Sequence, residues 1–426
     1  MSRPGFPPQS APAPAEPADT EVVPGLLPRE SSSGAASDPL AAPRWIRVGT
    51  SRRSDTAAAV AEALAPIQQG DPPALVLLFS SLAHDLELAV SLVADAVGSD
   101  RLIGCSTAGE LGAEGSSTGG LTLWALGGDG FSVAVGMGQG GSGGLRQAAT
   151  DAAHCLDQLQ RRRHTVLVLL ADGLCGDQVE VVRGAYDVAG VEVPLVGGCA
   201  GDDMAMVGTR QIYGRSVLRQ AVVAAAISSD APLGIGVSHC WEPVAHPMLV
   251  TASTGTEVLS LDDRPALDVL LEAFEAPEEV CRDPEAFSLW ATTHPLGIRR
   301  RDRIEIRYIA GADFQRRSLL TIAEVPQGGL ACLMKGDALS VLDATRQACR
   351  MAAEGLAGAP IKGMLLFDCV ARRSVLSLEH VEGEMQGIHA ICGDLPVGGF
   401  YTYGEIARTR GAGGFHNQTL VALALA

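Results

Sequence analysis

Three glycine-rich segments of this chain each contain a glycine followed by an acidic residue, and their composition favours the binding of a small polar ligand. The segments read Gly104-Cys-Ser-Thr-Ala-Gly-Glu-Leu111, Val196-Gly-Gly-Cys-Ala-Gly-Asp-Asp203 and Val397-Gly-Gly-Phe-Tyr-Thr-Tyr-Gly-Glu405. Glycine has no Cβ and tolerates positive φ values, so the backbone N–H groups of such a turn can approach an anion closely. The acidic side chain of each turn can bind an ammonium group. A small metabolite with both groups, such as an amino acid, is therefore the predicted ligand.

The predicted site is one pocket between two halves of the chain, where the three turns meet. Backbone N–H groups and the hydroxyl of Thr107 or Thr402 would bind the ligand's carboxylate, while Glu110, Asp202 or Glu405 would bind its ammonium group. Three carboxylates around one cavity repel one another, so at least one should have a raised pKa or an ion pair with a nearby arginine. The residues predicted to bind the ligand are Gly104, Cys105, Ser106, Thr107, Gly109, Glu110, Gly197, Gly198, Gly201, Asp202, Arg264, Tyr401, Thr402, Gly404, Glu405 and Asn417.

Other patterns of residues leave three alternatives to this site. The simplest is that the glycines only permit tight chain reversals and that the acidic side chains cap turns or face solvent. A second is an enzyme with Cys105 or Cys199 as nucleophile, although no neighbouring histidine in the sequence indicates a base. A third is dinucleotide binding, because residues 136–141 match the G-x-G-x-x-G spacing, but the acid expected about 20 residues later would fall inside a predicted helix. No C-x-x-C or H-E-x-x-H pattern indicates a metal site.

The three turns recur within the same order of predicted elements: a buried strand, a helix, the turn and a second strand. Around the first turn these are a strand over 74–79, a helix over 85–97 and a strand over 121–126; around the second, a strand over 165–171, a helix over 178–189 and a strand over 221–227; around the third, strands over 364–367 and 419–425. Such alternation predicts an α/β fold with mixed sheets and flanking helices.

The recurrence also indicates an internally duplicated chain with two domains. Residues 1–44 contain ten of the 24 prolines and almost no apolar pattern, so we expect a disordered tail. We assign residues 45–255 to an N-terminal domain and residues 256–426 to a C-terminal domain.

The composition disfavours several classes of partner. The formal net charge of −17 repels nucleic acid and anionic lipid. No apolar run approaches the roughly 20 residues that a membrane-spanning helix needs. The N-terminus has no basic segment followed by an apolar stretch, so we expect a cytoplasmic protein whose ten cysteines are reduced.

At these turns the sequence resembles the FIST family, which comprises predicted sensory and signal-transduction proteins with an N-terminal and a C-terminal FIST domain. Further segments that are similar to the family are Gly234-Ile-Gly-Val-Ser-His-Cys-Trp241, Arg264-Pro-Ala-Leu-Asp268, Pro295-Leu-Gly-Ile298 and His416-Asn-Gln-Thr419. The resemblance covers residues 45–426. It implies a cytoplasmic module that binds a small molecule and signals through a separate partner, such as a histidine kinase, because no kinase segment is present.

The resemblance also implies an alternative function, because some bacterial members of the family bind haem and sense nitric oxide. In that case a histidine would be the axial ligand of haem b. His239 is the candidate, since it lies in a family-like segment beside Trp241 and Met248. In the main hypothesis the protein has no cofactor, holds no metal and is not an enzyme.

Overall fold

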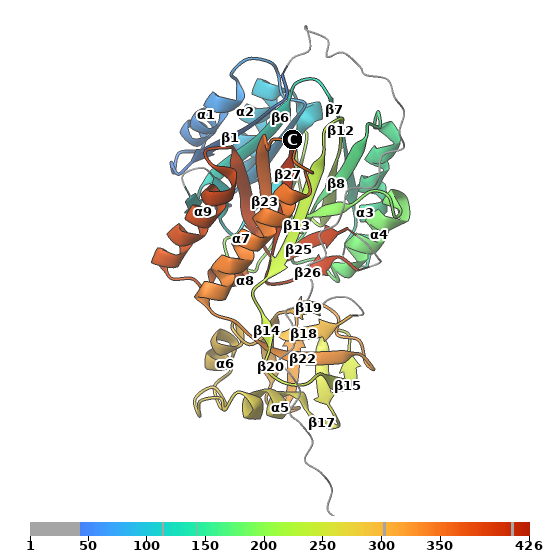
Figure 1. Cartoon of the computed structure of the whole chain (residues 1–426), viewed down its shortest axis with the longest axis vertical. Helices are drawn as coiled ribbons and strands as arrows, with labels where there is room; N and C mark the ends of the chain where they lie inside the picture. The colour runs from blue at the N-terminus through green and yellow to red at the C-terminus, as the bar shows by residue number, and fades with distance from the viewer. Residues whose placement is uncertain (1–42, 113–114, 142, 301–303, 410–412) are drawn as a thin grey trace, which may run out of the picture.

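The computed structural model describes residues 43–112, 115–141, 143–300, 304–409 and 413–426. Figure 1 shows them as a large body with a smaller domain below it. Most of the tail that we expected to be disordered, residues 1–42, lies outside the described residues. None of the helices in the described part of the chain combines the length and the apolarity that crossing a membrane requires.

The body consists of three units that repeat one plan: a strand, a helix, a strand, a helix, a strand, a β-hairpin and a return strand. Unit 1 contains β1 (Trp45–Ser51), α1 (Thr56–Ile67), β2 (Leu75–Ser80), α2 (Leu86–Val97), η1 (Ser99–Arg101), β3 (Leu102–Ser106), β4 (Glu110–Gly112), β5 (Gly115–Ser117) and β6 (Leu121–Gly127). Unit 2 contains β7 (Phe131–Gln139), α3 (Leu145–Ala153), η2 (His154–Gln158), β8 (His164–Ala171), α4 (Val179–Ala189), β9 (Leu195–Cys199), β10 (Gln211–Tyr213), β11 (Ser216–Leu218) and β12 (Ala221–Ser229). Unit 3 contains β13 (Leu233–His239), α7 (Ala338–Glu354), β23 (Gly363–Cys369), α8 (Val370–Arg373), α9 (Leu378–Cys392), β24 (Val397–Thr402), β25 (Glu405–Arg408), β26 (Phe415–His416) and β27 (Thr419–Leu425).

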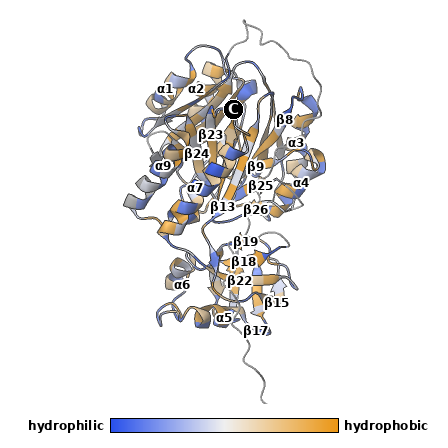
Figure 2. Ribbon diagram, in the orientation of Figure 1, coloured by the Kyte–Doolittle hydropathy of each residue, from blue (hydrophilic) through white to orange (hydrophobic). Residues whose placement is uncertain are grey.

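Local sequence explains why these elements form. Strand β2 is buried at every position, which fits its continuous apolar run. Helix α2 begins after Asp85, whose side chain accepts a hydrogen bond from the backbone N–H of Leu88 at 3.0 Å, and it ends at Gly98 with φ +89°. In Figure 2 the hydrophobic colour runs along the central strands, while the hydrophilic colour is concentrated on the outer helices and loops.

Each unit forms the core of a mixed sheet with the same pairing. The return strand lies antiparallel to the first and second strands, and the second and third strands are parallel, as in the orders β1-β6-β2-β3, β7-β12-β8-β9 and β13-β27-β23-β24. The prediction of an α/β fold with mixed sheets and flanking helices is therefore confirmed. We predicted an internal duplication, and the plan does recur. The plan occurs three times in the body.

The β-hairpins link the three units in a ring. The hairpin of unit 1 pairs through β4 with β24 of unit 3, that of unit 2 pairs through β10 with β3 of unit 1, and that of unit 3 pairs through β25 with β9 of unit 2. Each six-stranded sheet thus contains strands from two units. The glycine-rich turns connect the third strand of each unit to its hairpin, so all three turns lie where the units join.

Close backbone contacts explain several of the glycines that the sequence patterns singled out. A Cβ on Gly104, Gly197 or Gly399 would lie 2.0, 1.9 or 1.9 Å from a leucine carbonyl oxygen of the neighbouring strand. Gly136 and Gly138 lie in β7, where a Cβ would meet the carbonyl oxygens of helix α3 at 2.3 and 2.0 Å. The G-x-G-x-x-G spacing therefore serves strand–helix packing, since these glycines lie in a strand and not in a phosphate-binding loop.

The smaller domain interrupts unit 3 between β13 and α7. It contains β14 (Glu242–Pro243), β15 (Met248–Thr254), β16 (Glu257–Leu261), β17 (Arg264–Pro265), α5 (Ala266–Ala273), α6 (Pro284–Ala291), β18 (Leu296–Arg299), β19 (Ile304–Arg307), β20 (Ile309–Asp313), β21 (Ser318–Thr321) and β22 (Leu330–Lys335), whose strands form one nine-stranded sheet. The boundary that we predicted between residues 255 and 256 falls in the hairpin that joins β15 to β16. In space, the segments before and after the smaller domain belong to one unit. Strand β13, which precedes the smaller domain in the chain, pairs with β27, which follows it.

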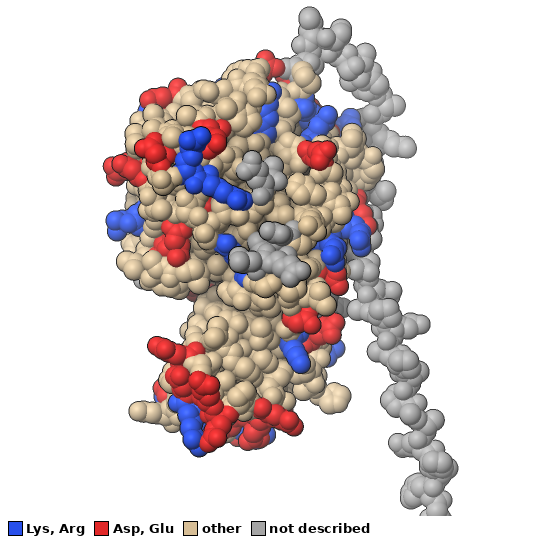
Figure 3. Space-filling model, turned by 90° about the vertical axis from the view of Figure 1, so that its left-hand side faces the viewer, with Lys and Arg blue, Asp and Glu red and all other residues tan. Residues whose placement is uncertain are grey.

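Charged side chains are spread unevenly over the surface. On the face shown in Figure 3, basic and acidic groups are interspersed over the body, and acidic groups gather at the end of the smaller domain that lies away from the body. No continuous basic surface is visible on this face.

Candidate functional site

The carboxyl ends of the parallel strands in the three units lie at the junction of the turns, and a pocket of about 610 Å³ lies beside this junction. Ligands in α/β sheets commonly bind at the carboxyl ends of strands. All three units contribute to the pocket wall. Its lining residues are Ser81, Ala83, Ala108, Thr118, Gly119, Asp203, Met204, Val370, Arg373 and Ser374.

Two oppositely charged side chains line this pocket. Asp203 follows β9, and its Oδ2 accepts hydrogen bonds from the Ser81 hydroxyl at 2.8 Å and the Leu82 backbone N–H at 2.9 Å. Arg373 lies on α8, with its guanidinium carbon 4.8 Å from the centroid of the Tyr401 ring. Within the described residues neither Asp203 nor Arg373 forms an ion pair. The pocket therefore offers an acceptor for a cationic group and a donor for an anionic group.

A histidine that the sequence analysis did not single out lies beside the pocket. The His84 side chain is buried, and its Nδ1 lies 3.3 Å from the Thr56 hydroxyl. The pKa of His84 is lowered, because the effect of burial outweighs the opposite effect of the nearby Asp203 carboxylate. This wall of the pocket could have been predicted from the polar residues that directly follow the apolar strand β2.

Asp202, which we predicted to bind the ligand, instead organises the loop that follows β9. Its carboxylate accepts hydrogen bonds from the backbone N–H groups of Met206, Val207 and Gly208 at 2.7–2.9 Å, and from the Tyr403 hydroxyl at 2.6 Å. Burial would raise the pKa of Asp202, but these hydrogen bonds together lower it. The carboxylate is thus engaged with its own loop, and the next residue, Asp203, lines the pocket.

The structure brings the three turns together through their backbones. The Gly201 N–H donates to the Ser106 carbonyl at 3.0 Å, the Ala108 N–H to the Tyr401 carbonyl at 3.0 Å, and the Cys199 N–H to the Gly404 carbonyl at 2.7 Å. These bonds use the N–H groups that we expected to bind an anion. None of the sixteen predicted ligand-binding residues lines the pocket of about 610 Å³.

The acidic residues of the first and third turns are buried and form hydrogen bonds within their own units. Glu110 accepts hydrogen bonds from the hydroxyls of Thr107 and Ser117 at 2.6 and 2.8 Å. Glu405 accepts one from the Thr402 hydroxyl at 2.5 Å and one from the Thr419 N–H at 3.1 Å. Burial raises the pKa of Glu110, and it raises that of Glu405 to about 8. Raised pKa values were expected here, but their main cause is burial and not mutual repulsion around a ligand.

Two further predicted residues do not line the pocket: Arg264 lies in the smaller domain, and Asn417 is buried in the body. Arg264 lies in the smaller domain, where its guanidinium pairs with Glu272 at 2.5 Å and its side chain is 54% exposed. Asn417 is buried and donates a hydrogen bond from its side-chain amide to the His416 carbonyl at 2.9 Å. Arg264 therefore does not compensate the acidic turns.

The two cysteines of the enzymatic alternative are fully buried. Burial raises the pKa of Cys105 and of Cys199 well above that of an ordinary thiol. Because the thiolate is the nucleophilic form, the environment of both residues disfavours nucleophilic catalysis.

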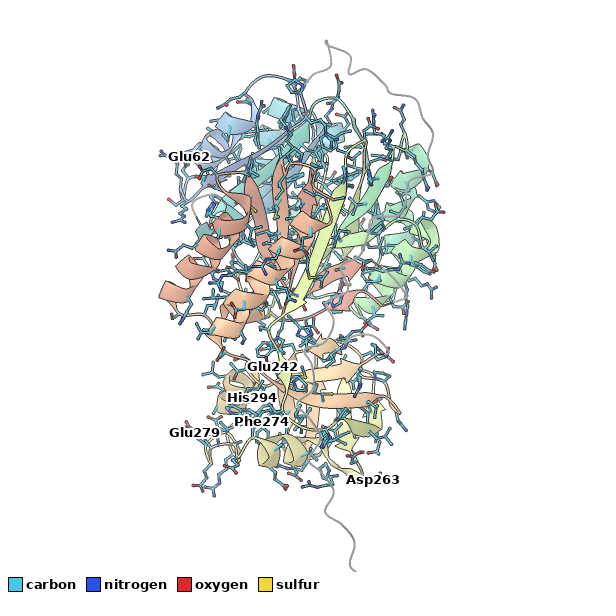
Figure 4. The ribbon with its side chains drawn as sticks, viewed as in Figure 1. Glu62, Glu242, Asp263, Phe274, Glu279 and His294 are labelled. Atoms are coloured by element: carbon cyan, nitrogen blue, oxygen red, sulfur yellow. The ribbon has the colours of Figure 1, made fainter. Side chains whose placement is uncertain are left out.

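The candidate haem ligand, His239, lies at the end of β13. Its Nδ1 accepts a hydrogen bond from the Trp241 N–H at 3.3 Å, and burial lowers its pKa. Neither the pocket beside the turns nor a second pocket of about 300 Å³ in the smaller domain is lined by a histidine. His294, labelled in Figure 4, stacks on Trp290 with a centroid distance of 3.9 Å and so packs the smaller domain.

Haem binding therefore stays a prediction. In addition, the described residues contain no group of three or more His, Cys, Asp or Glu side chains that could hold a metal ion. An absorption spectrum of protein supplied with haem would test this alternative directly, because a bound haem has an intense Soret band.

The raised pKa of Glu405 predicts a specific pH dependence of stability. The folded protein keeps a proton on this carboxyl up to about pH 8, whereas the unfolded chain loses it near the ordinary value of 4.5. The free energy of unfolding should therefore fall as the pH rises through this window. Glu405→Gln should make this fall smaller, as measured by chemical denaturation at pH 5, 6.5 and 8. The exposed Glu87→Gln is the control, and equal slopes for wild type and Glu405→Gln would contradict the prediction.

Comparisons with known proteins agree with the family resemblance that was found in the glycine-rich turns. Residues 74–264 match the FIST N domain, and residues 266–408 match the FIST C domain. An uncharacterized protein of Mycobacterium tuberculosis strain H37Rv is 28% identical over 391 residues, which cover 88% of this chain and 97% of that protein. An uncharacterized protein of strain CDC 1551 has the same identity and coverage.

Proposed function

Because this chain belongs to the FIST family, whose domains are associated with signal transduction and sensing, we propose that it senses a small zwitterionic metabolite in the pocket between its three units. One observation carries the proposal: Asp203 and Arg373 line the same pocket and neither has an ion-pair partner among the described residues. A ligand with an ammonium and a carboxylate group complements both. An α-amino acid is the simplest metabolite of this kind.

Each pocket group has a defined part in this proposal. The Arg373 guanidinium binds the ligand's carboxylate, and the Asp203 carboxylate binds its ammonium group. The hydroxyl of Thr118 adds a neutral hydrogen-bonding group to the pocket wall. Two charge-assisted contacts contribute about 1.5–3 kcal/mol each, which leaves micromolar to millimolar affinity after the cost of immobilising the ligand. Such affinity suits a sensor of metabolite concentration.

The position of the pocket supports a signalling role for the bound ligand. Asp203 and Met204 belong to the part that matches the FIST N domain, and Val370 and Arg373 belong to the part that matches the FIST C domain. A ligand that contacts both parts favours the arrangement in which its contacts are best. We expect the output to pass to a separate signalling protein, such as a histidine kinase.

Substitution of the two charged residues tests the proposal. A thermal-shift screen of the twenty standard amino acids against the full chain identifies the ligand, and calorimetry then measures its affinity. Arg373→Met and Asp203→Asn should each weaken binding by about 10- to 100-fold, because each removes one charge-assisted contact. Asparagine keeps the size of Asp203 and can adopt its φ of +55°.

Arg146→Met is the matched control, since Arg146 pairs with Asp187 at 2.9 Å on the outer helices of unit 2 and does not line the pocket. It should leave the affinity unchanged. If none of the amino acids binds, or if both pocket variants bind as wild type does, the proposed function is wrong.

A further inference from the structure

The pocket has an apolar side to which Met204 contributes an exposed side chain, and we infer that Met204 selects ligands that carry an apolar side chain. This inference rests on the proposed function, in which Asp203 and Arg373 bind the charged end of the ligand. It goes further in assigning the ligand's substituent: an aliphatic chain that packs against the thioether of Met204.

The loop that carries Met204 exposes an unusual amount of apolar surface. Met204 is 54% exposed, Met206 60% and Val207 88%. Large apolar side chains at neighbouring positions of a surface loop mark a place where apolar surface becomes covered. Of these three residues, only Met204 lines the pocket, so a ligand in the pocket would cover Met204 and leave the other two exposed.

The backbone of this loop is held in a conformation that methionine disfavours. Met204 has φ +67° and Met206 has φ +56°, although side chains with a Cβ rarely adopt this region. Hydrogen bonds impose the conformation: the Met204 N–H donates to the Tyr403 hydroxyl at 2.9 Å, and the buried Asp202 carboxylate binds the N–H groups that follow. Strain that the surrounding structure maintains is typical of functional sites.

The other apolar residues of the pocket come from different elements and complete this side. Ala83 follows β2, Ala108 lies in the first turn, and Val370 begins α8. The small alanines leave room, while the long unbranched side chain of Met204 can adapt to ligands of different shape. Because the pocket holds about 610 Å³, it has space beyond the charged groups of an amino acid for a side chain of several carbons.

A homologous series of ligands tests the inference. The probes are glycine, L-alanine, L-2-aminobutyrate, L-norvaline and L-norleucine, which present the same charged groups and differ only in aliphatic length. Calorimetry on the full chain should show affinity that rises about two- to fourfold for each added carbon, because each buries one more methyl or methylene group. Met204→Asn should abolish most of this rise and leave the affinity for glycine within about twofold of wild type.

Met206→Asn is the matched control, because Met206 lies two residues away, has a similar exposure and a positive φ, and does not line the pocket. Asparagine tolerates positive φ, so both variants relieve the same strain. The control should keep the dependence on chain length. A flat series in wild type, a rise that Met204→Asn keeps, or a flat series in both variants overturns the inference while the proposed function stands. If no member of the series binds, the inference is wrong, and the screen of the twenty amino acids decides separately whether the proposed function stands.

Discussion

Replacing Arg372 by methionine is expected to lower the free energy of unfolding by about 3–5 kcal/mol, the usual cost of removing one partner from a buried ion pair. The Arg372 side chain is fully buried and binds Asp368 at 2.6 Å, the Thr345 hydroxyl at 2.6 Å and Glu384 at 3.3 Å. Tyr401 donates a further hydrogen bond to Glu384 at 3.3 Å. Methionine would leave two carboxyl groups in the interior without their cation.

The pH dependence distinguishes this electrostatic loss from a loss of packing. Burial already raises the pKa of Asp368. Arg372 lowers the pKa of Asp368, so without it this carboxyl should keep its proton to a higher pH in the folded variant than in wild type, whereas the unfolded chain ionises it above about pH 4. The deficit of Arg372→Met relative to wild type should therefore grow between pH 5 and pH 8 in chemical denaturation.

Arg373→Met is the control for this prediction, because Arg373 is the next residue on α8 but faces the pocket. Its loss should cost less than about 1 kcal/mol, the range of a single cation–π contact. A similar loss for both variants, or a deficit of Arg372→Met that does not change with pH, would show that the buried ion pair does not stabilise unit 3 in this way.

The second large effect is expected at the glycines where neighbouring strands approach. In Gly104→Ala the new Cβ would lie 2.0 Å from the Leu78 carbonyl oxygen, which is far inside van der Waals contact. Two paired backbones must move apart to accommodate it, so we expect a loss of at least about 3 kcal/mol. Gly197→Ala and Gly399→Ala should behave alike, since their Cβ atoms would meet carbonyl oxygens at 1.9 Å.

Thermal and chemical denaturation of these variants measures the effect, with Gly143→Ala as the control. A Cβ on Gly143 has no atom within 4 Å, so this substitution should leave stability unchanged or raise it by about 0.5 kcal/mol through the unfolded state. If Gly104→Ala were as stable as Gly143→Ala, the strands would have room to separate and the repeated close approach would not be a requirement of the fold.

The ring of exchanged hairpins explains why residues far apart in the chain form one pocket. Thr118 follows the hairpin of unit 1, Asp203 follows the third strand of unit 2, and Arg373 lies in unit 3. The hairpins of units 1 and 2 pair with β24 and β3, which brings these segments to one place. The proposed ligand site and the junctions of the units therefore lie in the same region of the body.

Local sequence was sufficient for the elements and for their repetition. Apolar runs and capping residues predict strands such as β2 and helices such as α2, because both patterns depend on neighbours a few residues apart. The glycine-rich turns were found for the same reason, since a position where two backbones approach needs glycine whatever surrounds it. Membership of the FIST family follows from these segments and from the matches over residues 74–264 and 266–408.

Only the tertiary structure decided which side chains face the pocket. The sequence analysis favoured Asp202 and Arg264, whereas the pocket is lined by Asp203 and Arg373. Asp202 and Asp203 are neighbours whose side chains differ in direction because hydrogen bonds hold the loop, and Arg373 enters the site through the pairing of hairpins between units. Such placement depends on contacts between residues more than 100 positions apart, and a local pattern contains no information about which of two adjacent charges those contacts will bury.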